Sequence, residues 1–401
     1  MLRRWLCVWV VLLVAFALPD AVDAKKRRSK PRVQRRVAVP LIPARIAVPD
    51  YPPDGPYASA LLADADSGRV LYAKALFEAR PPASMVKMMT ALVTFEALDR
   101  GEVRLDQKVL ISREASRTGG SGVALRAGEV LTLDDLLRAM MVASANGASV
   151  AIAETVAGST EAMIARMNQR ARELGLNETV YRTVNGLPPR RGRGLADVSS
   201  ANDLAIVARK LLDHTDVFHY SSHPVVPIRN GTVLLRNTNH LVGRMDGADG
   251  LKTGYYRQAG FNLTATATRG GMRLIAVVLG CPTLYTRFAV AQQLLEWGFG
   301  HFSKLTLVEA GQPISLEVQV ANGATDHLRP VAREGLTYVV RNDQKQDLHV
   351  IFQVPSVVSA PIAKDQELGE IIIRDQEQIL DVIPAVSPVD IVSFPAAAAN
   401  P

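Results

Sequence analysis

A hydroxyl and an amine stand three positions apart in Ser84-Met85-Val86-Lys87. On a helix, positions i and i+3 lie on one face, so Ser84 Oγ and Lys87 Nζ can meet. Serine is a weak nucleophile until a base takes its proton, and lysine can be that base if burial or a nearby cation lowers its pKa. The pattern therefore predicts nucleophilic catalysis at Ser84. The alternative is an N-cap serine beside a surface lysine.

A second hydroxyl occurs in Ser144-Ala145-Asn146, directly after an apolar helical pattern. Such a hydroxyl can relay protons, and an amide side chain can hold a substrate carbonyl or a neighbouring lysine. The same letters recur in Ser200-Ala201-Asn202. There, however, Asp203 and an apolar helix follow, which is typical of a helix N-cap. We therefore expect the loop at Ser144, and not the one at Ser200, to reach a cleft.

A third group of chemical interest is Lys252-Thr253-Gly254. A lysine and a hydroxyl at a strand edge can clamp a carboxylate, and a glycine lets a substrate backbone approach closely. The alternative is a turn with a solvated lysine.

The patterns between these groups predict the elements that position them. Ala58–Asp64 and Arg69–Ala73 flank the turn residues Asp66-Ser67-Gly68 and predict a hairpin. Apolar residues at helical spacing run from Met85 to Phe95. Further helices are expected at Leu133–Val142, Gly147–Ala157, Glu161–Leu174, Ser200–Leu212 and Arg287–Trp297, and strands at Gly260–Thr268 and Arg273–Leu279.

Helical periodicity stops after about Ser303, and short β-like runs divided by Gly, Pro, Asn and Asp follow. These runs predict a small all-β domain over about 304–385. The runs are Leu305–Val308, Ile314–Val320, Leu336–Val340, His349–Val354 and Glu370–Arg374.

The order and spacing of the three groups resemble the serine penicillin-recognising enzymes, a class that includes β-lactamases and penicillin-binding proteins. More closely, Ala83–Thr90, Leu125–Ala148, Leu174–Leu187 and Asp249–Leu263 resemble the D-alanyl-D-alanine carboxypeptidase family, the low-molecular-mass penicillin-binding proteins. Leu294–Phe299 resembles the helix that closes that family's catalytic domain. The resemblance covers roughly 55–385.

The resemblance implies an α/β (α+β) β-lactamase/transpeptidase-like domain, with helices on an antiparallel sheet, over 55–303, and a small all-β domain over 304–385. A flexible tail over 386–401 would follow. The implied activity is removal of the terminal D-alanine from peptidoglycan stem pentapeptides, with β-lactams as covalent inhibitors and without a metal or other cofactor.

The resemblance also implies a role for each matching residue. Ser84 would be the nucleophile, Lys87 the general base, Ser144 a proton carrier and Asn146 a substrate-holding amide. Lys252 and Thr253 would bind the terminal carboxylate, next to Gly254 in the substrate-binding segment, and the backbone N–H groups of Ser84 and Tyr255 would form the oxyanion hole. Arg287 stands where the family has an arginine that can face the substrate carboxylate. A surface helix arginine is the alternative.

Three features depart from the family's pattern. Tyr255 stands where a histidine is frequent, and Gly147 stands where an aspartate is frequent. Many members end in an amphipathic anchoring helix, but Pro384, Pro388 and Pro395 oppose one here. We therefore expect any membrane contact to come from the N-terminal end.

Residues 1–24 are typical of a secretory signal. Arg3 and Arg4 precede the apolar run Trp5–Leu18, and small residues allow a cut after Ala24. An uncleaved anchor is the alternative. We expect a periplasmic or cell-envelope protein.

The net charge of +7 belongs to a basic, proline-containing leader over 25–54. Eight Lys and Arg residues and no acid lie within 25–36, which leaves residues 37–401 with a net charge of −1. A nucleic-acid-binding domain would be basic across a folded face, so that class is excluded. The leader is expected to be disordered, and it could lie on an anionic membrane or be merely solvated.

Three neighbouring histidines could suggest a metal site, and one cysteine could suggest a reactive thiol, but we expect neither function. His214, His219 and His223 do not have the spacing of a zinc ligand pair. Cys281 is the single cysteine that remains after removal of Cys7 with the signal, and we expect a buried structural thiol.

Other functions stay open at this stage. A D,D-endopeptidase would need the same residues. A β-lactamase of class A would carry a glutamate-centred loop, whereas Glu178 lies in a stretch that resembles the carboxypeptidases. A non-catalytic envelope-binding protein could keep the fold and lack turnover.

Overall fold

The computed structural model describes residues 54–189, 194–345, 348–375 and 378–394. The predicted signal and almost all of the predicted leader lie outside these residues. Among the helices of the described residues, none combines the length and the apolar character needed to cross a membrane.

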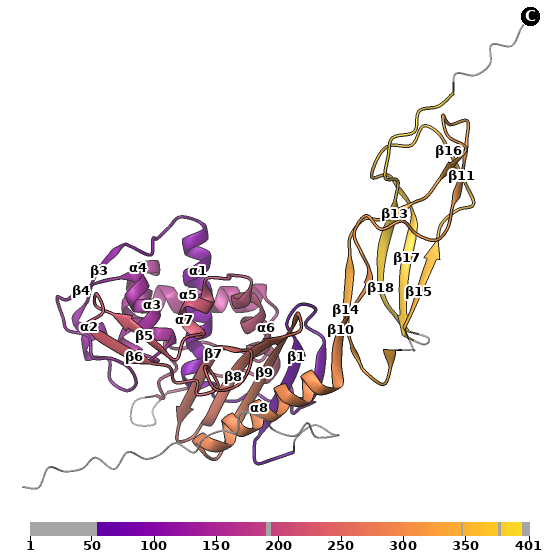
Figure 1. Ribbon diagram of the computed structural model, residues 1–401. Coiled ribbons are helices and arrows are strands. Elements are labelled where there is room, and N and C mark those ends of the chain that lie inside the picture. Colours follow the sequence, from indigo (N-terminus) through magenta and orange to yellow (C-terminus); the bar gives the residue numbers. More distant parts are fainter. Residues whose placement is uncertain (1–53, 190–193, 346–347, 376–377, 395–401) are drawn as a thin grey trace, which may run out of the picture. The chain divides into compact units, whose positions relative to one another are not determined.

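A five-stranded antiparallel sheet organises the first part of the chain, in the order β2-β1-β9-β8-β7 (Figure 1). The predicted N-terminal hairpin is confirmed by β1 and β2, which pair with each other, and β1 also pairs with β9. The strands are β1 (Ser59–Asp64), β2 (Val70–Lys74), β7 (Ala248–Tyr256), β8 (Gly260–Arg269) and β9 (Met272–Cys281).

Both faces of this sheet are buried, because successive residues of a strand point to opposite faces. On β1, Leu61 belongs to the core under one face and Leu62 to the core under the other. On β9, Val277 and Val278 are divided in the same way. The near-continuous apolar runs in these strands follow from this double burial.

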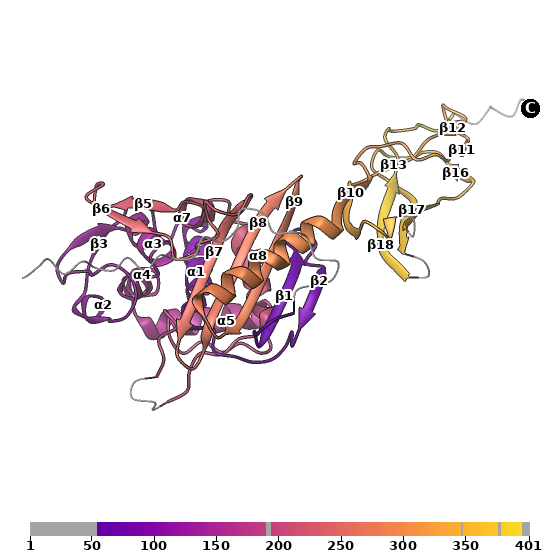
Figure 2. The ribbon, with the colours of Figure 1, turned by 60° about the horizontal axis from the view of Figure 1, so that its bottom comes forward.

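One helix covers one face of the sheet, and a group of helices covers the other. The helix α8 (Leu284–His301) packs on β1, β8 and β9 (Figure 2). On the opposite face, α6 packs on β1 and β9, and α1 packs on α3, α4, α5 and α6. These helices are α1 (Lys87–Asp99), α3 (Leu133–Met141), α4 (Asn146–Ala157), α5 (Thr160–Glu173) and α6 (Ala201–Leu212).

The predicted helices are confirmed to within a few residues, with one clear error. The helix expected at Arg287–Trp297 begins three residues earlier, because Thr283 caps it by accepting a hydrogen bond from the Thr286 N–H. It also continues past Gly298 to His301. A Cβ on Gly298 would lie 2.6 Å from Leu274, so this glycine permits close packing of helix on sheet and does not end the helix.

Short elements complete this part of the chain. Two small two-stranded sheets, β3 with β4 and β5 with β6, are separate from the main sheet. The elements are η1 (Ala83–Val86), β3 (Lys108–Leu110), α2 (Arg113–Arg117), β4 (Val130–Thr132), α7 (Val217–Ser221), β5 (Val225–Ile228) and β6 (Val233–Arg236).

From Phe302 on, the described residues form strands and no helix, which confirms the all-β character predicted there. Ile314–Val320 was expected to be one strand, but only its end belongs to β11. The strands are β10 (Phe302–Val308), β11 (Val318–Ala321), β12 (His327–Leu328), β13 (Val331–Ala332), β14 (Leu336–Arg341), β15 (Leu348–Gln353), β16 (Val357–Ser359), β17 (Glu367–Asp375) and β18 (Gln378–Val386).

Candidate active site

Ser84 and Lys87 lie where the 3-10 turn η1 passes into α1. In a 3-10 turn, residues i and i+3 eclipse each other, which aligns the two side chains. Lys87 Nζ lies 2.9 Å from Ser84 Oγ. Sequence spacing alone therefore predicted this contact correctly.

Lys87 is fully buried, and its surroundings favour the uncharged amine. Burial and the nearby charge of Lys252 lower the pKa of Lys87 well below its ordinary value, and the carboxyl of Asp197 opposes this in part. Nζ donates to Asn146 Oδ1 and to the Asn185 carbonyl, each at 2.7 Å. A neutral amine has two N–H groups, so these two acceptors leave its lone pair for the Ser84 hydroxyl.

The backbone that leads into the nucleophile is tightly enclosed. Ala83 adopts a φ of +52°, a sparsely populated conformation that clusters at functional sites. A Cβ on Gly186 would lie 1.9 Å from the Ala83 carbonyl, and one on Gly254 would lie 2.4 Å from the Pro82 carbonyl. Glycine is required at both positions because two segments pass directly against η1.

Ser144 and Lys252 form a second hydroxyl–amine pair. Lys252 Nζ donates to Ser144 Oγ at 2.9 Å and to the Thr253 carbonyl at 3.2 Å. Burial and the positive charge of Arg287 lower the pKa of Lys252 to about 7. Ser144 itself has a φ of +61° in the loop between α3 and α4, which turns its hydroxyl toward β7.

Asn146 joins the two pairs. It is the first residue of α4, and while its Oδ1 accepts from Lys87, its Nδ2 donates to the Gly119 carbonyl at 2.9 Å. The next residue, Gly147, has no space for a side chain such as aspartate. A Cβ there would lie 2.4 Å from the Ala115 carbonyl, so backbone packing from α2 supports this loop.

Thr253, Gly254 and Tyr255 lie on the edge strand β7. Thr253 Oγ1 donates to Thr238 Oγ1 at 2.9 Å. The ring of Tyr255 is 53% exposed and stacks on Phe261, with 4.0 Å between ring centroids. A flat aromatic surface therefore borders the open side of the Lys252-Thr253-Gly254 segment.

Arg287 is not the surface arginine that the sequence allowed as an alternative. It is buried, and its Nη1 donates to the carbonyls of Gly254 and Asn262 at 3.2 and 3.3 Å. Its guanidinium also lies over the ring of Phe288. Burial lowers the pKa of Arg287 to about 10, so the group remains a cation at neutral pH and acts on Lys252.

Sequence reasoning missed the loop that holds Lys87 from the side opposite α4. Asp197 accepts hydrogen bonds from the N–H groups of Arg182 and Thr183 and from Thr183 Oγ1. Thr183 Oγ1 in turn accepts from the Gly186 N–H. This network fixes the loop that brings the Asn185 carbonyl to Lys87. A backbone carbonyl leaves no signal in residue type, which is why the pattern could not reveal it.

A hollow of about 630 Å³ adjoins this loop. Gly119 and Asn185 line it, and the carbonyls of these residues bond Asn146 and Lys87. The site therefore borders a space large enough for a peptide segment.

Ser200 takes the place that the sequence predicted for it. Its Oγ accepts from the Asp203 N–H and caps α6. The two serine-x-asparagine motifs thus have different roles, one at the site and one in the fold.

We expect the variants of these two serines to separate activity from stability. Ser144→Ala removes the partner of Lys252 and lowers kcat about 100-fold, the scale of one lost proton-transfer group, with little change in the free energy of unfolding. Ser200→Ala lowers the free energy of unfolding by about 1 kcal/mol through loss of the cap, with kcat retained. Denaturant unfolding and turnover of a pentapeptide measure both, and a kcat loss in Ser200→Ala equal to that in Ser144→Ala would refute the assignment.

The remaining candidates are given no part in the chemistry. Cys281 is buried as expected, and burial raises the pKa of its thiol to about 12. His214 stacks on Phe95 and lies 3.1 Å from a carboxylate oxygen of Asp99. Within the described part of the chain, no three His, Cys, Asp or Glu residues are placed to hold a metal ion.

Comparisons with known proteins all place this chain in the same family. Residues 50–283 match the family model described as D-alanyl-D-alanine carboxypeptidase, and residues 302–393 match the C-terminal domain of penicillin-binding protein 5. D-alanyl-D-alanine carboxypeptidase DacF of Bacillus subtilis is 35% identical over 83% of this chain and 85% of its own length. DacA of Escherichia coli is 33% identical over 78% of each.

Solved structures give the same result. Penicillin-binding protein 5 of Haemophilus influenzae aligns with a TM-score of 0.73 and 29% identity, covering 86% of this chain and 99% of its own. Penicillin-binding protein D2 of Listeria monocytogenes, solved in an ampicillin-bound form, aligns with a TM-score of 0.54 and 31% identity, covering 61% of this chain and 97% of its own.

Proposed function

Because the chain belongs to the D-alanyl-D-alanine carboxypeptidase family, we propose that it removes the terminal D-alanine from peptidoglycan stem peptides through an acyl-enzyme formed on Ser84. The enzyme is a serine-type carboxypeptidase of the low-molecular-mass penicillin-binding class. The observation that carries the residue assignment is the buried amine of Lys87 beside Ser84 Oγ.

In the first step the lone pair of Lys87 takes the proton of Ser84 as Oγ attacks the penultimate D-alanyl carbonyl. The two carbonyl partners of Lys87 hold its N–H groups and orient the lone pair. The oxyanion that forms would be held by the N–H groups of Ser84 and Tyr255. The close approach of Gly254 and Gly186 to η1 supports this, because it brings β7 next to the nucleophile.

The leaving D-alanine carries the terminal carboxylate, and we assign its binding to Lys252 and Thr253. The proton that Lys87 took from Ser84 would reach the departing amine through the Ser144 hydroxyl, which is hydrogen-bonded to Lys252 and would be left unchanged by the relay. Water then hydrolyses the ester on Ser84. Arg287 is assigned a supporting role, since its positive charge adds to the field of Lys252 and its hydrogen bonds hold β7 against β8.

Penicillins would acylate Ser84 as mimics of the substrate. The test is release of D-alanine from a purified pentapeptide, measured with fluorescent penicillin labelling of the same preparation. Turnover that is blocked by penicillin supports the proposal, and a labelled protein that releases no D-alanine would leave only a penicillin-binding protein.

The pH dependence of this enzyme follows from Lys252. With a pKa of about 7, the amine is cationic below that pH and neutral above it. If the cation binds the carboxylate, kcat/KM for a pentapeptide falls as the pH rises through about 7, since kcat/KM reports the free enzyme.

Arg287→Gln removes a cation that lowers the pKa of Lys252, so the fall of kcat/KM on the basic side of the pH profile moves to higher pH. Arg257→Gln, an exposed arginine beside β7, is the matched control. A limb that stays in place in Arg287→Gln would refute the coupling.

We propose a separate role for each segment of the chain. Residues 55–303 would carry catalysis, and residues 304–385 would form a separate β-rich domain. The part of the predicted tail that the structure describes packs on this domain, because Ile391 is buried with Val320 and Ile362. We propose export by the signal over 1–24 and contact of the basic leader over 25–54 with the anionic surface of the membrane. Binding of the mature protein to anionic but not neutral vesicles, lost when the leader is removed, tests the last point.

A further inference from the structure

The hollow of about 630 Å³ beside the catalytic lysine carries charged groups that the chemistry at Ser84 does not use. Its wall includes Glu114 of α2, Glu161 at the start of α5, and Arg182, which lies three residues before Asn185. Much of the remaining wall is apolar and consists of Val150, Ile164, Leu187, Pro188, Pro189 and Leu195. We call this space the Arg182 hollow. It offers one cation and two carboxylates beside an apolar surface.

The charges of the Arg182 hollow are not paired within the protein. Within the part of the chain that the structure describes, no ion pair involves Glu114, Glu161 or Arg182. Arg182 bonds Asp197 through its backbone N–H, which leaves the guanidinium for a ligand. Backbone and hydroxyl hydrogen bonds at the start of α5 lower the pKa of Glu161, so its carboxylate stays ionised. All three groups can therefore bind a charged ligand.

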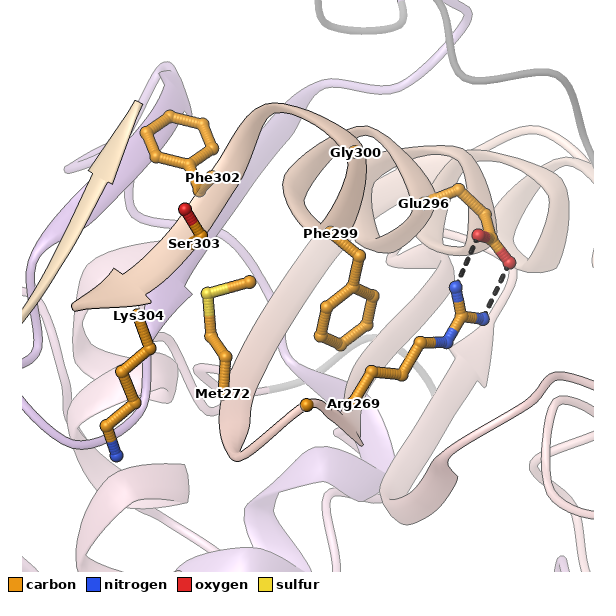
Figure 3. A pocket seen from close by; sticks show the side chains of 9 residues that line it. Arg269, Met272, Glu296, Phe299, Gly300, Phe302, Ser303 and Lys304 are labelled. Atoms are coloured by element: carbon orange, nitrogen blue, oxygen red, sulfur yellow. Dashed lines mark hydrogen bonds and ion pairs between the residues drawn. The ribbon is translucent and has the colours of Figure 1, made fainter. Parts of the chain in front are cut away.

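A second arginine-containing hollow, of about 420 Å³, shows the contrast (Figure 3). There Arg269 donates to both carboxylate oxygens of Glu296, at 2.6 and 2.8 Å, and lies over the ring of Phe299. The protein already matches the charge of Arg269. That hollow therefore offers no unpaired guanidinium to a ligand, whereas the Arg182 hollow does.

The Arg182 hollow borders the catalytic pair on a side away from the leaving group. Asn185 lines the hollow, and its carbonyl accepts from Lys87 Nζ, which also contacts Ser84 Oγ. The leaving D-alanine is assigned to Lys252 and Thr253 of β7, and none of the described residues that line the hollow belongs to β7. The hollow is therefore available to the part of the substrate that stays on Ser84.

That part of a stem pentapeptide ends in a D-alanine, which a third residue precedes. The third residue is one extended residue, about 3.5 Å, from the acylated carbon, so its side chain can enter a space that begins at Asn185. In some peptidoglycans this side chain ends in an amine alone, as in lysine. In others it ends in an amine and a carboxylate on one carbon, as in meso-diaminopimelate. A guanidinium and two carboxylates match the second kind, since each charge of the side chain then meets an opposite one.

We infer that the Arg182 hollow binds the side chain of the third stem residue and selects a diamino diacid over lysine. Arg182 binds the carboxylate of that side chain, and Glu114 and Glu161 bind its ammonium. The apolar residues of the wall contact its methylene groups. This selectivity rests on the proposed function, since it concerns the substrate of the same Ser84.

The test compares D-alanine release by the full chain from two free pentapeptides, one with meso-diaminopimelate and one with lysine as the third residue. The wild type is expected to have a kcat/KM about 10-fold or more higher for the diaminopimelate peptide, the scale of a hydrogen bond between charged groups. Arg182→Gln removes the cation and keeps the backbone N–H that bonds Asp197, so the ratio of the two kcat/KM values falls to near one.

Matched controls identify the charge that is responsible. Amidation of the side-chain carboxylate of diaminopimelate should remove the preference of the wild type in the same way as Arg182→Gln. Glu114→Gln/Glu161→Gln should lower kcat/KM for both peptides, because both side chains end in an ammonium. Arg172→Gln removes an exposed arginine of α5 that does not line the hollow, and it should keep the wild-type ratio.

The outcomes separate this selectivity from the proposed function. D-alanine release from both peptides at equal kcat/KM in the wild type refutes the selectivity alone. A ratio that persists in Arg182→Gln or after amidation, an equal fall in Arg172→Gln, or unchanged rates in Glu114→Gln/Glu161→Gln also refutes it. A wild type that releases D-alanine from neither peptide refutes the proposed function.

Discussion

Replacing Ser84 with alanine is expected to abolish covalent labelling of the protein by a fluorescent penicillin. The label needs an ester to Ser84 Oγ. Among the described residues, the hydrogen-bond partner of this hydroxyl is the Lys87 amine, which forms no ester, and the other hydroxyl of the site, Ser144, is paired with Lys252. Ser84 is only partly buried, so loss of its hydroxyl should leave the fold intact, with an unfolding temperature close to that of the wild type. Gel fluorescence after incubation with the probe measures the label, and mass spectrometry of the wild type locates the adduct.

The control for this prediction is Ser200→Ala, because Ser200 lies in the decoy motif and caps α6. It should label like the wild type. Label on Ser84→Ala at the wild-type level, or an adduct on any other residue, would remove Ser84 as the nucleophile.

Replacing Lys87 with alanine is expected to slow acylation of Ser84 by penicillin at least ~100-fold, the scale of lost general-base catalysis. No other described amine lies within hydrogen-bond distance of Ser84 Oγ, so no group takes over the proton. The wild-type rate should fall as the pH is lowered, since the pKa of Lys87 is depressed and only the neutral form is a base. Stopped-flow or gel-based acylation kinetics across pH give both results.

Folding must be separated from chemistry in this experiment, because Lys87→Ala leaves Asn146 Oδ1 and the Asn185 carbonyl without a donor. Lys87→Met leaves the same two acceptors without a donor, but it fills the volume of the side chain, so it should lose less stability than Lys87→Ala and acylate as slowly. Lys210→Ala, an exposed lysine on α6, is the control for preparation and assay. An acylation rate like that of the wild type in either Lys87 variant would exclude this residue as the base.

Local sequence patterns correctly predicted several contacts and elements of this protein. The spacing of Ser84 and Lys87 predicted their contact because three residues along a helical turn bring side chains together in any fold. The N-cap at Ser200 and the N-terminal hairpin also depend on neighbours in the chain. The family resemblance added the roles that no single motif could support.

Other features depended on groups far apart in the sequence. The pairing of Lys252 with Ser144 joins residues 108 positions apart, and the sheet order β2-β1-β9-β8-β7 sets β1 beside β9. Neither follows from periodicity, which describes one element and not its neighbour. The length of α8 was underestimated because Gly298 packs against the sheet instead of ending the helix, and this is visible only when both surfaces are present.

The sequence by itself determined which side chains could act as nucleophile and base, since their types and spacing are local. The tertiary structure decided whether they could work. Burial and the charge of Lys252 lower the pKa of Lys87 and favour its neutral form, burial and the charge of Arg287 lower the pKa of Lys252, and the Asn185 carbonyl holds one N–H of Lys87. These properties are electric fields and hydrogen bonds summed over distant segments, and they arise only when the chain has closed around them.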